Sequence, residues 1–578
     1  MGSYDIRFKE PPAPREQLIL YSQSVDDAVP PDAEVRHFAA LMDEVDWRPW
    51  EAAYEGYGQP PIHPRYLASA ILFGLMNRVY STRDLEYAAA RNLDFIWLLE
   101  GFTPDHSTFA NFQARHDRAI EDLNRQVAGM LVRGRKRALL ALLVDGTRMQ
   151  ANSERGGART AESIQRALEE LNRRLDRLRA SAQRAPETAC FEGMAPEEDA
   201  EEALARVSKE IKALLRKQAQ YEKALGVARE RDKKARKHNG KKARSVPVPV
   251  TDPEAQVLPN KDGGFAPNYT PVAAVDAETG AILHADIAEG SDEAGTVQPA
   301  VESAQKVAGQ TPDTLAADGN FASGEVLKNL AEKEIDAYMP THADSPPDNP
   351  ALRPDPSVPV SEEDIAKLPA DRNGVFKRSA FVYDAAADCY YCPMGQAMWV
   401  YRRGLNRGVV RGHYRGRSCE GCPLAPRCLK KGSAFRTIVR DEYEHLREAT
   451  AERMATPEGK AVYAQRAPGI ERVFAHVKGQ MGIRQFRRRG KEKIRAEWQW
   501  ICAGLNTKHL LAQCMKIPGA NPLNALRTLT SNAAGVPNTI STSLSSFCRR
   551  VVSSAKRPHN WNPSRIHASR INLVPQGS

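Results

Sequence analysis

Cysteines and long apolar runs are both scarce in this sequence. Nine cysteines among 578 residues are too few for a disulfide scaffold. No basic segment followed by an apolar one opens the chain, as a secretory signal would. Both observations favour a reducing, cytoplasmic location. No apolar run approaches the roughly 18–20 residues that a membrane-spanning helix needs, which argues against a membrane protein.

Acidic residues are fewer than basic ones, 72 against 82, which leaves a formal charge of +10. Such an excess indicates a polyanionic partner, and nucleic acid is the leading class. Asp and Glu are absent beyond Lys516, where Ser, Asn and Pro dominate. We predict a basic, disordered tail over 517–578. The length is several times that of one domain of roughly 100–200 residues, so we expect at least three structural units.

The region before residue 135 favours short helices. Apolar spacing of three and four residues from Pro64 predicts one helix. Ser81 begins a capping-box pattern that opens a second, and Asp105 or Ser107 could cap a third. Short helices with brief turns are typical of a helix-turn-helix domain, although most small helical bundles bind no DNA.

The clearest periodicity lies between residues 160 and 237. Apolar residues recur three and four apart in two runs, as in a coiled coil: Ile164, Leu168, Leu171, Leu175 and Leu178, then Leu204, Val207, Ile211, Leu214, Tyr221 and Leu225. Prolines between the runs interrupt a continuous helix, which predicts an antiparallel helical hairpin. The basic segment that follows could touch phosphates or form a solvated face.

Three acids are candidates for one metal site. Asp145 and Asp318 each end a short apolar run typical of a buried strand. Glu471 lies in a helix with an apolar stripe. Carboxylates arranged at neighbouring strand ends and on a facing helix can hold two hard cations, and oxygen ligands favour Mg²⁺ or Mn²⁺. On spacing alone, exposed turn aspartates before glycine are the commoner alternative.

Five of the nine cysteines fall within forty residues: Cys389, Cys392, Cys419, Cys422 and Cys428. Two Cys-x-x-Cys pairs suit a structural, tetrahedral zinc site made of four thiolates. Five cysteines for four ligands leave one spare.

A basic stretch follows Glu471. Phosphate contacts by these residues would make binding weaken as salt rises, whereas a solvated helix face is the alternative. Adjacency to Glu471 favours DNA binding. The residues are Arg484, Arg487, Arg488, Arg489, Lys491, Lys493 and Arg495.

These motifs, read in order, resemble those of bacterial insertion-sequence DDE transposases. Three segments carry this resemblance: Leu143-Val144-Asp145-Gly146-Thr147, Ala316-Ala317-Asp318-Gly319-Asn320-Phe321, and Tyr463-x-x-Arg466 followed by Glu471 and Lys478. The helical region from Pro64 to His116, with Asp105-His106-Ser107-Thr108-Phe109, is similar to the N-terminal domain of that family.

The resemblance implies an α/β, RNase H-like mixed sheet flanked by helices. Asp145 would lie on the first strand, Asp318 after the fourth and Glu471 on a late helix, and together they would hold two Mg²⁺ or Mn²⁺ ions. Tyr463, Arg466 and Lys478 would contact the DNA end. The gap between Arg466 and Glu471 is one residue longer than the commonest family pattern, which leaves a surface arginine as the alternative for Arg466.

A cysteine-rich insertion precedes the catalytic glutamate in that family and begins with Cys-Pro-x-Gly, here Cys392-Pro393-Met394-Gly395. The resemblance therefore favours Cys392, Cys419, Cys422 and Cys428 as structural zinc ligands. Cys389 is a possible ligand and the expected spectator.

The resulting hypothesis is a transposase that binds the terminal inverted repeats of its element, cuts by Mg-dependent hydrolysis and joins the ends to target DNA. The expected partner is double-stranded DNA, with a homodimer or larger assembly forming on it, in a bacterial, nucleoid-associated setting. The alternatives are a catalytically silent, zinc-stabilised DNA-binding protein and a metal-dependent DNA nuclease that does not join.

The expected organisation begins with an arm and ends with the basic tail. The divisions are an N-terminal arm (1–57), a helix-turn-helix-like DNA-binding domain (58–135), a catalytic domain (136–516) interrupted by a coiled-coil hairpin (160–245) and by a linker with the zinc insertion (340–455), and the tail (517–578).

Overall fold

A computed structural model describes residues 24–54, 60–133, 140–189, 197–239, 244–260, 263–290, 292–341, 348–406, 408–417, 419–429 and 432–516. The tail expected at 517–578 and the first 23 residues of the expected arm lie outside these ranges. Within them, no helix combines the length and apolar character needed to cross a membrane.

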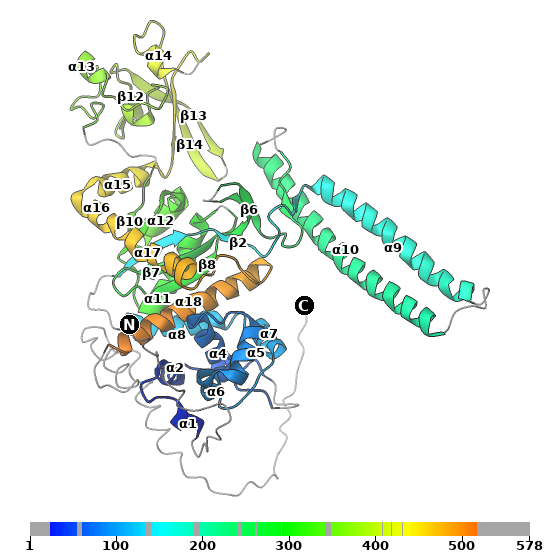
Figure 1. Cartoon of the computed structure of the whole chain (residues 1–578). Coiled ribbons are helices and arrows are strands. Elements are labelled where there is room, and N and C mark those ends of the chain that lie inside the picture. The colour runs from blue at the N-terminus through cyan, green and yellow to red at the C-terminus, as the bar shows by residue number, and fades with distance from the viewer. Residues whose placement is uncertain are drawn as a thin grey trace, which may run out of the picture. The chain divides into compact units, whose positions relative to one another are not determined.

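A mixed five-stranded sheet carries the two aspartates (Figure 1). Its order is β10-β9-β1-β7-β8. The strands are β1 (Ala141–Gly146), β7 (Pro271–Asp276), β8 (Ile282–Ile287), β9 (Thr314–Ala317) and β10 (Asp336–Tyr338). β1 pairs antiparallel with β7 and parallel with β9, while β9 pairs parallel with β10. β7 and β8 are antiparallel and join through a turn in which Gly280 has a φ of 71°.

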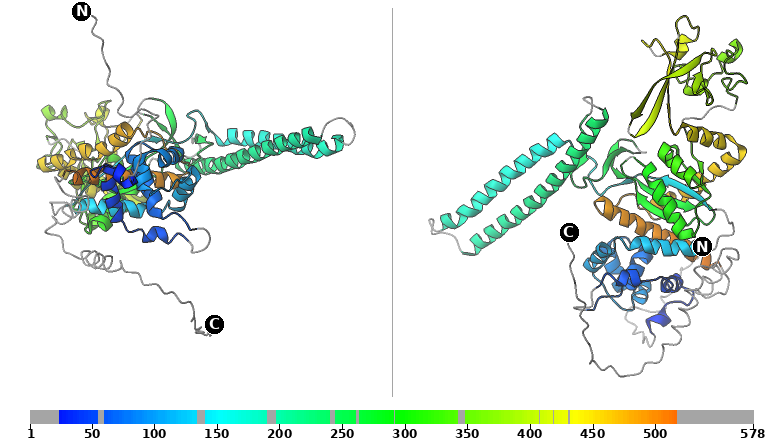
Figure 2. Two further views of the ribbon diagram at one scale, coloured as in Figure 1. Left: turned by 60° about the horizontal axis from the view of Figure 1, so that its bottom comes forward. Right: turned by 180° about the vertical axis from the view of Figure 1, so that it is seen from behind.

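Helices pack around this sheet and complete a mixed α/β fold, as expected. They are α11 (Val297–Ala308), α12 (Gly324–Glu332), α17 (Arg466–Ala475) and α18 (Lys491–Cys514), with 3₁₀ turns η2 (Ala294–Thr296) and η3 (Gly319–Phe321). α18 lies between the sheet and the N-terminal helices (Figure 2). Trp498 of α18 is fully buried, and its indole N–H donates to the Val272 carbonyl at 2.9 Å. Trp498 is therefore a core residue.

The N-terminal helices begin at the predicted caps. The Ser81 hydroxyl accepts the Asp84 amide, and the Asp105 carboxylate accepts the Thr108 amide. These helices share one hydrophobic core with α18 and the sheet. They are α1 (Val25–Ala28), α2 (Glu34–Asp43), α3 (Arg48–Glu51), α4 (Pro64–Met76), α5 (Thr82–Arg91), α6 (Leu93–Leu98), α7 (His106–Arg115) and α8 (Ile120–Val132).

The predicted helical hairpin is confirmed. α9 (Ala161–Ala189) and α10 (Glu197–Asn239) lie side by side (Figures 1 and 2) and bury heptad residues such as Ile164 and Leu175. An exposed polar pair also joins the two helices, where the Gln218 amide donates to Asn172 Oδ1 at 2.8 Å. Short strands flank the hairpin: β2 (Met149–Gln150), β3 (Ala158–Arg159), β4 (Val248–Pro249), β5 (Gln256–Pro259) and β6 (Phe265–Tyr269).

The cysteine-rich region forms a second five-stranded sheet, antiparallel throughout, with a hydrophobic core of its own. We call it the cysteine module. Its elements are α13 (Glu362–Ile365), η4 (Arg378–Ala380), β11 (Val382–Asp384), β12 (Cys389–Tyr391), β13 (Ala397–Asn406), β14 (Val409–Gly416), α14 (Ala425–Cys428) and β15 (Thr437–Asp441). Helices α15 (Glu444–Ala455) and α16 (Pro457–Ala464) then lead into α17.

Candidate functional site

The sheet register brings Asp145 and Asp318 to the same edge. Val144 of β1 pairs with Ala317 of β9, and each aspartate is the next residue along its strand direction. Asp145 Oδ1 accepts the Gly146 amide at 2.8 Å, and Asp318 Oδ1 accepts the Asn320 amide at 2.5 Å. The ends of two parallel neighbours therefore present two carboxylates together.

Arg466 of α17 contacts the first of these aspartates. Its Nη1 lies 2.6 Å from Asp145 Oδ2, and the two side chains are only 15% and 18% exposed. Burial raises the pKa of the Asp145 carboxyl, whereas the Arg466 charge lowers it. The Tyr463 ring lies below the same guanidinium, 5.5 Å from ring centroid to Cζ. Arg466 is thus largely buried against Asp145 rather than exposed at the surface.

A glycine lets α17 approach β1 closely. A Cβ on Gly469 would lie 2.3 Å from Leu143 Cδ1, so any larger residue at this position would require the Leu143 side chain to move. Ile470 and Phe474 bury the same helix against the core. A π-helical turn (His476–Gln480) follows, and Lys478 within it donates to Thr147 Oγ1 at 2.6 Å and to the Arg148 carbonyl at 2.8 Å. Lys478 therefore reaches the segment directly after Asp145.

Glu471 is not joined to the aspartates by a contact in this structure. It is an exposed residue of α17, and within the described ranges it forms no hydrogen bond or ion pair. Across the same ranges, no group of three or more His, Cys, Asp or Glu side chains is arranged to hold a metal ion. The predicted triad is therefore assembled in part, through Asp145 and Asp318.

Glu293 is a third carboxylate at this edge, and sequence reasoning missed it. A Cβ on Gly146 would lie 3.4 Å from Glu293 Oε1. Burial raises the pKa of Glu293, and the charges of Asp318 and Asp145 raise it further. Glu293 precedes η2 in the connection from β8 to α11 and ends no apolar run. The one sequence feature that could have identified Glu293 is its position shortly after β8, the third strand of this sheet along the chain.

Several residues of the basic stretch are engaged within the protein. Arg488 forms a bidentate pair with Asp117, at 2.5 and 2.7 Å. The Arg489 side chain donates to the Asn152 carbonyl at 2.9 Å, and that of Arg484 donates to the Lys478 carbonyl at 3.4 Å. These contacts tie the stretch to the helical N-terminal region and to the segment after β2.

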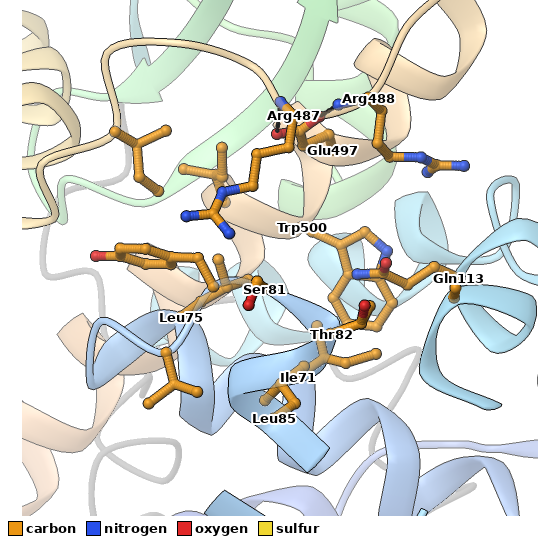
Figure 3. A pocket seen from close by; sticks show the side chains of 15 residues that line it. Ile71, Leu75, Ser81, Thr82, Leu85, Gln113, Arg487, Arg488, Glu497 and Trp500 are labelled. Atoms are coloured by element: carbon orange, nitrogen blue, oxygen red, sulfur yellow. Dashed lines mark hydrogen bonds between the residues drawn. The ribbon is translucent and has the colours of Figure 1, made fainter. Parts of the chain in front are cut away.

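Arg487 faces a cavity of about 330 Å³ between α5 and α18 (Figure 3). Ser81 and Thr82 line it at the start of α5, and Trp500 lines it from α18. Trp500 is 2% exposed and belongs to the core. The guanidinium of Arg487 lies 5.5 Å from the Tyr80 ring.

Four cysteines line one small cavity of about 30 Å³ in the cysteine module: Cys392, Cys419, Cys422 and Cys428. Cys389 lies on β12, is fully buried, and is not among the lining residues. Burial raises the pKa of the Cys428 thiol to about 11 and also raises that of Cys392. The four grouped cysteines are the four that the family resemblance favours.

Comparison with protein-family models gives two matches. Residues 23–115 match a model described as a transposase domain (DUF772), and residues 391–511 match a model described as a transposase DDE domain. No curated protein matches the chain. Because the N-terminal segment and the C-terminal segment both match transposase domains, the comparison indicates a transposase. The matches confirm the resemblance to insertion-sequence DDE transposases. A DDE domain suggests a nucleotidyl-transfer enzyme, and the family implies DNA binding and use of a divalent metal.

Proposed function

We propose that this transposase binds the terminal inverted repeats of an insertion sequence, hydrolyses a phosphodiester there, and transfers the freed 3′ end into target DNA. The observation that carries the proposal is the paired register of Asp145 and Asp318, with Arg466 contacting Asp145 from the helix that bears Glu471. The strand order and directions also support an RNase H-like catalytic fold.

The donor set fits a hard divalent cation. Asp145 and Asp318 supply carboxylate oxygens at one edge, and Glu471 would supply the third from α17; such ligands favour Mg²⁺ or Mn²⁺. When bound, a pair of such ions activates the attacking oxygen and stabilises the leaving one. Burial raises the pKa of the Asp145 carboxyl, and the charge of Arg466 opposes this rise and so favours the ionised form.

Basic side chains near this edge would position the DNA. Lys478 lies beside Thr147, two residues beyond Asp145, where its ammonium can meet a phosphate. Tyr463, Arg484, Arg487, Arg488 and Arg489 are the further candidate DNA contacts. Because two element ends must be joined in one event, we expect a homodimer or larger assembly on DNA.

Zinc is proposed as a structural cofactor of the cysteine module. Its support is the grouping of Cys392, Cys419, Cys422 and Cys428 around one cavity. Four thiolates fill a tetrahedral site and leave no position for a reacting water, so zinc would stabilise this module rather than catalyse.

The test is Mg-dependent cleavage and joining of DNA that carries the sequences flanking this reading frame. We expect the parent to cut and join, and Glu471→Gln to bind but not cut. Glu458→Gln removes the same charge from an exposed position of α16 and is the matched control. Binding without cleavage by the parent would favour a silent DNA-binding protein. Cleavage without joined products would favour a nuclease.

A further inference from the structure

β13 and β14 form a long two-stranded ribbon within the cysteine module. The two strands pair from Met398 and Gly416 to Asn406 and Val409. β12 pairs with β13 only over Ala397–Trp399, and β15 pairs with β14 only over Arg411–Arg415. β13 therefore has only β14 as its partner beyond Trp399, and the last two pairs of the ribbon, Leu405–Val410 and Asn406–Val409, lie beyond the pairing with β12 and β15. Glu442, directly after β15, still bonds to Val410: its amide donates to the Val410 carbonyl at 3.1 Å, and its Oε1 accepts the Val410 amide at 2.9 Å.

The ribbon is strongly cationic. Residues 397–417 contain six arginines and no Asp, Glu or Lys. Arg403 pairs with Asp388. Arg402, Arg411, Arg415 and Arg417 form no ion pair with any residue that the structure describes. Within the described ranges these four arginines thus have no carboxylate partner, whereas Arg488 and Arg495 of the basic stretch have Asp117 and Asp286 as partners.

Apolar side chains are exposed on the same module. Six of the fifteen large hydrophobic residues that are exposed in the described chain lie on or beside the ribbon: Trp399, Tyr401, Leu405, Val410, Phe435 and Val439. The guanidinium of Arg415 lies 4.6 Å from the Tyr401 ring and 4.9 Å from the Phe435 ring. The outer face thus combines aromatic rings with cations, a combination that suits nucleic acid.

We propose that the β13–β14 ribbon is a second DNA-binding element, which takes double-stranded DNA through phosphate contacts and groove insertion. This inference rests on the proposed function, because it names a further surface for the same substrate. A two-stranded ribbon fits a major groove about 12 Å wide, and arginine binds phosphates and guanine edges with its planar fork. The absence of acidic residues from 397–417 favours a polyanion over a protein surface of mixed charge.

The test compares the full-length parent with Arg402→Gln/Arg411→Gln on duplex DNA that carries the element ends. Fluorescence anisotropy from 50 to 200 mM salt gives the affinity and its salt dependence. We expect at least about tenfold weaker binding, and a slope of log K against log salt that is shallower by about 1.8, since each phosphate contact contributes about 0.9. Arg372→Gln/Lys377→Gln removes two exposed cations elsewhere in the module and should match the parent.

A second measurement depends on position rather than on charge. Asn406→Cys, carrying a tethered iron chelate that generates hydroxyl radicals, should cut DNA at a few defined positions near the element end. Circular dichroism and the thermal midpoint establish that each variant is folded.

Three outcomes overturn the inference, and they are distinguishable. If Arg402→Gln/Arg411→Gln leaves the DNA affinity and its salt dependence unchanged, and the chelate at position 406 cuts no DNA, the ribbon is not a DNA-binding element. The proposed function is then unaffected. A change in oligomeric mass with unchanged DNA affinity shows that the ribbon binds a second copy of the chain. Failure of the parent itself to bind duplex DNA overturns the proposed function as well.

Discussion

The carboxylates at the edge of the central sheet differ in how the surrounding residues hold them. Asp145 is held by Arg466 and by the Gly146 amide, so its position is set from both the helix and the strand. Burial and the charges of Asp318 and Asp145 raise the pKa of Glu293, and the Asn320 hydrogen bond and the Arg148 charge offset this rise only in part. The two residues therefore differ in how much their ionised forms oppose folding.

Glu293→Gln is expected to raise thermal stability without divalent ions. Because the pKa of Glu293 is raised on folding, the native state binds a proton more tightly than the unfolded chain does. The free energy of unfolding therefore falls as pH rises from the ordinary value near 4.5 through the raised value. We expect Tm to increase by about 2 °C at pH 7–8, with no increase at pH 4, in scanning calorimetry.

The control and the metal response separate this effect from a general one. Glu302→Gln on α11 removes an exposed carboxylate and should leave the pH profile unchanged. If the Glu293 carboxylate interacts electrostatically with a bound Mg²⁺ ion, adding Mg²⁺ should raise Tm more in the parent than in Glu293→Gln. An equal rise at pH 4 and pH 8 would contradict the electrostatic explanation.

At the scale of elements, local sequence patterns predicted much of what the structure contains. The heptads predicted α9 and α10, and the caps at Ser81 and Asp105 predicted the starts of α5 and α7. Each of these signals acts within a few residues or along one repeating stripe, so no distant contact is needed to interpret it. The apolar runs before Asp145 and Asp318 likewise became β1 and β9.

The cysteine module is expected to contain one zinc ion per chain. Elemental analysis of the purified protein should find about one equivalent of zinc, because four thiolates complete a tetrahedral site. Cys422→Ser should lose this zinc and lower Tm, whereas Cys389→Ser, from outside the shared cavity, should keep it. A parent without zinc, or equal loss in both variants, would contradict the assignment.

At the scale of the whole molecule, α18 connects the helical N-terminal region to the central sheet. Asn506 of α18 accepts the Ile282 amide at 2.9 Å, and its own amide donates to the Ile282 carbonyl and to Asn124 Oδ1 at 2.9 and 3.0 Å. All three residues are buried. One side chain thereby links α18, β8 and α8.

Asn506→Ala should destabilise both regions together. The substitution leaves the buried Ile282 and Asn124 groups without their partners, which costs roughly 2–4 kcal/mol in the free energy of unfolding. Chemical denaturation followed by tryptophan fluorescence and by circular dichroism should show one shifted transition in both signals. Gln513→Ala, whose amide contacts His509 on the same helix, should have little effect. Two separated transitions would contradict a shared core.

The sequence by itself determined the features that repeat or act locally: the charge excess, the heptads, the caps, the strand-ending aspartates and the cysteine spacing. The tertiary structure decided which distant residues meet, because pairing across hundreds of positions leaves no local pattern. Arg466 reaches Asp145 because α17 packs against β1, with Gly469 lying against Leu143. Glu293 joins the aspartates only because the connection from β8 to α11 passes Gly146. Register and helix packing, rather than composition, therefore assembled this edge of the sheet.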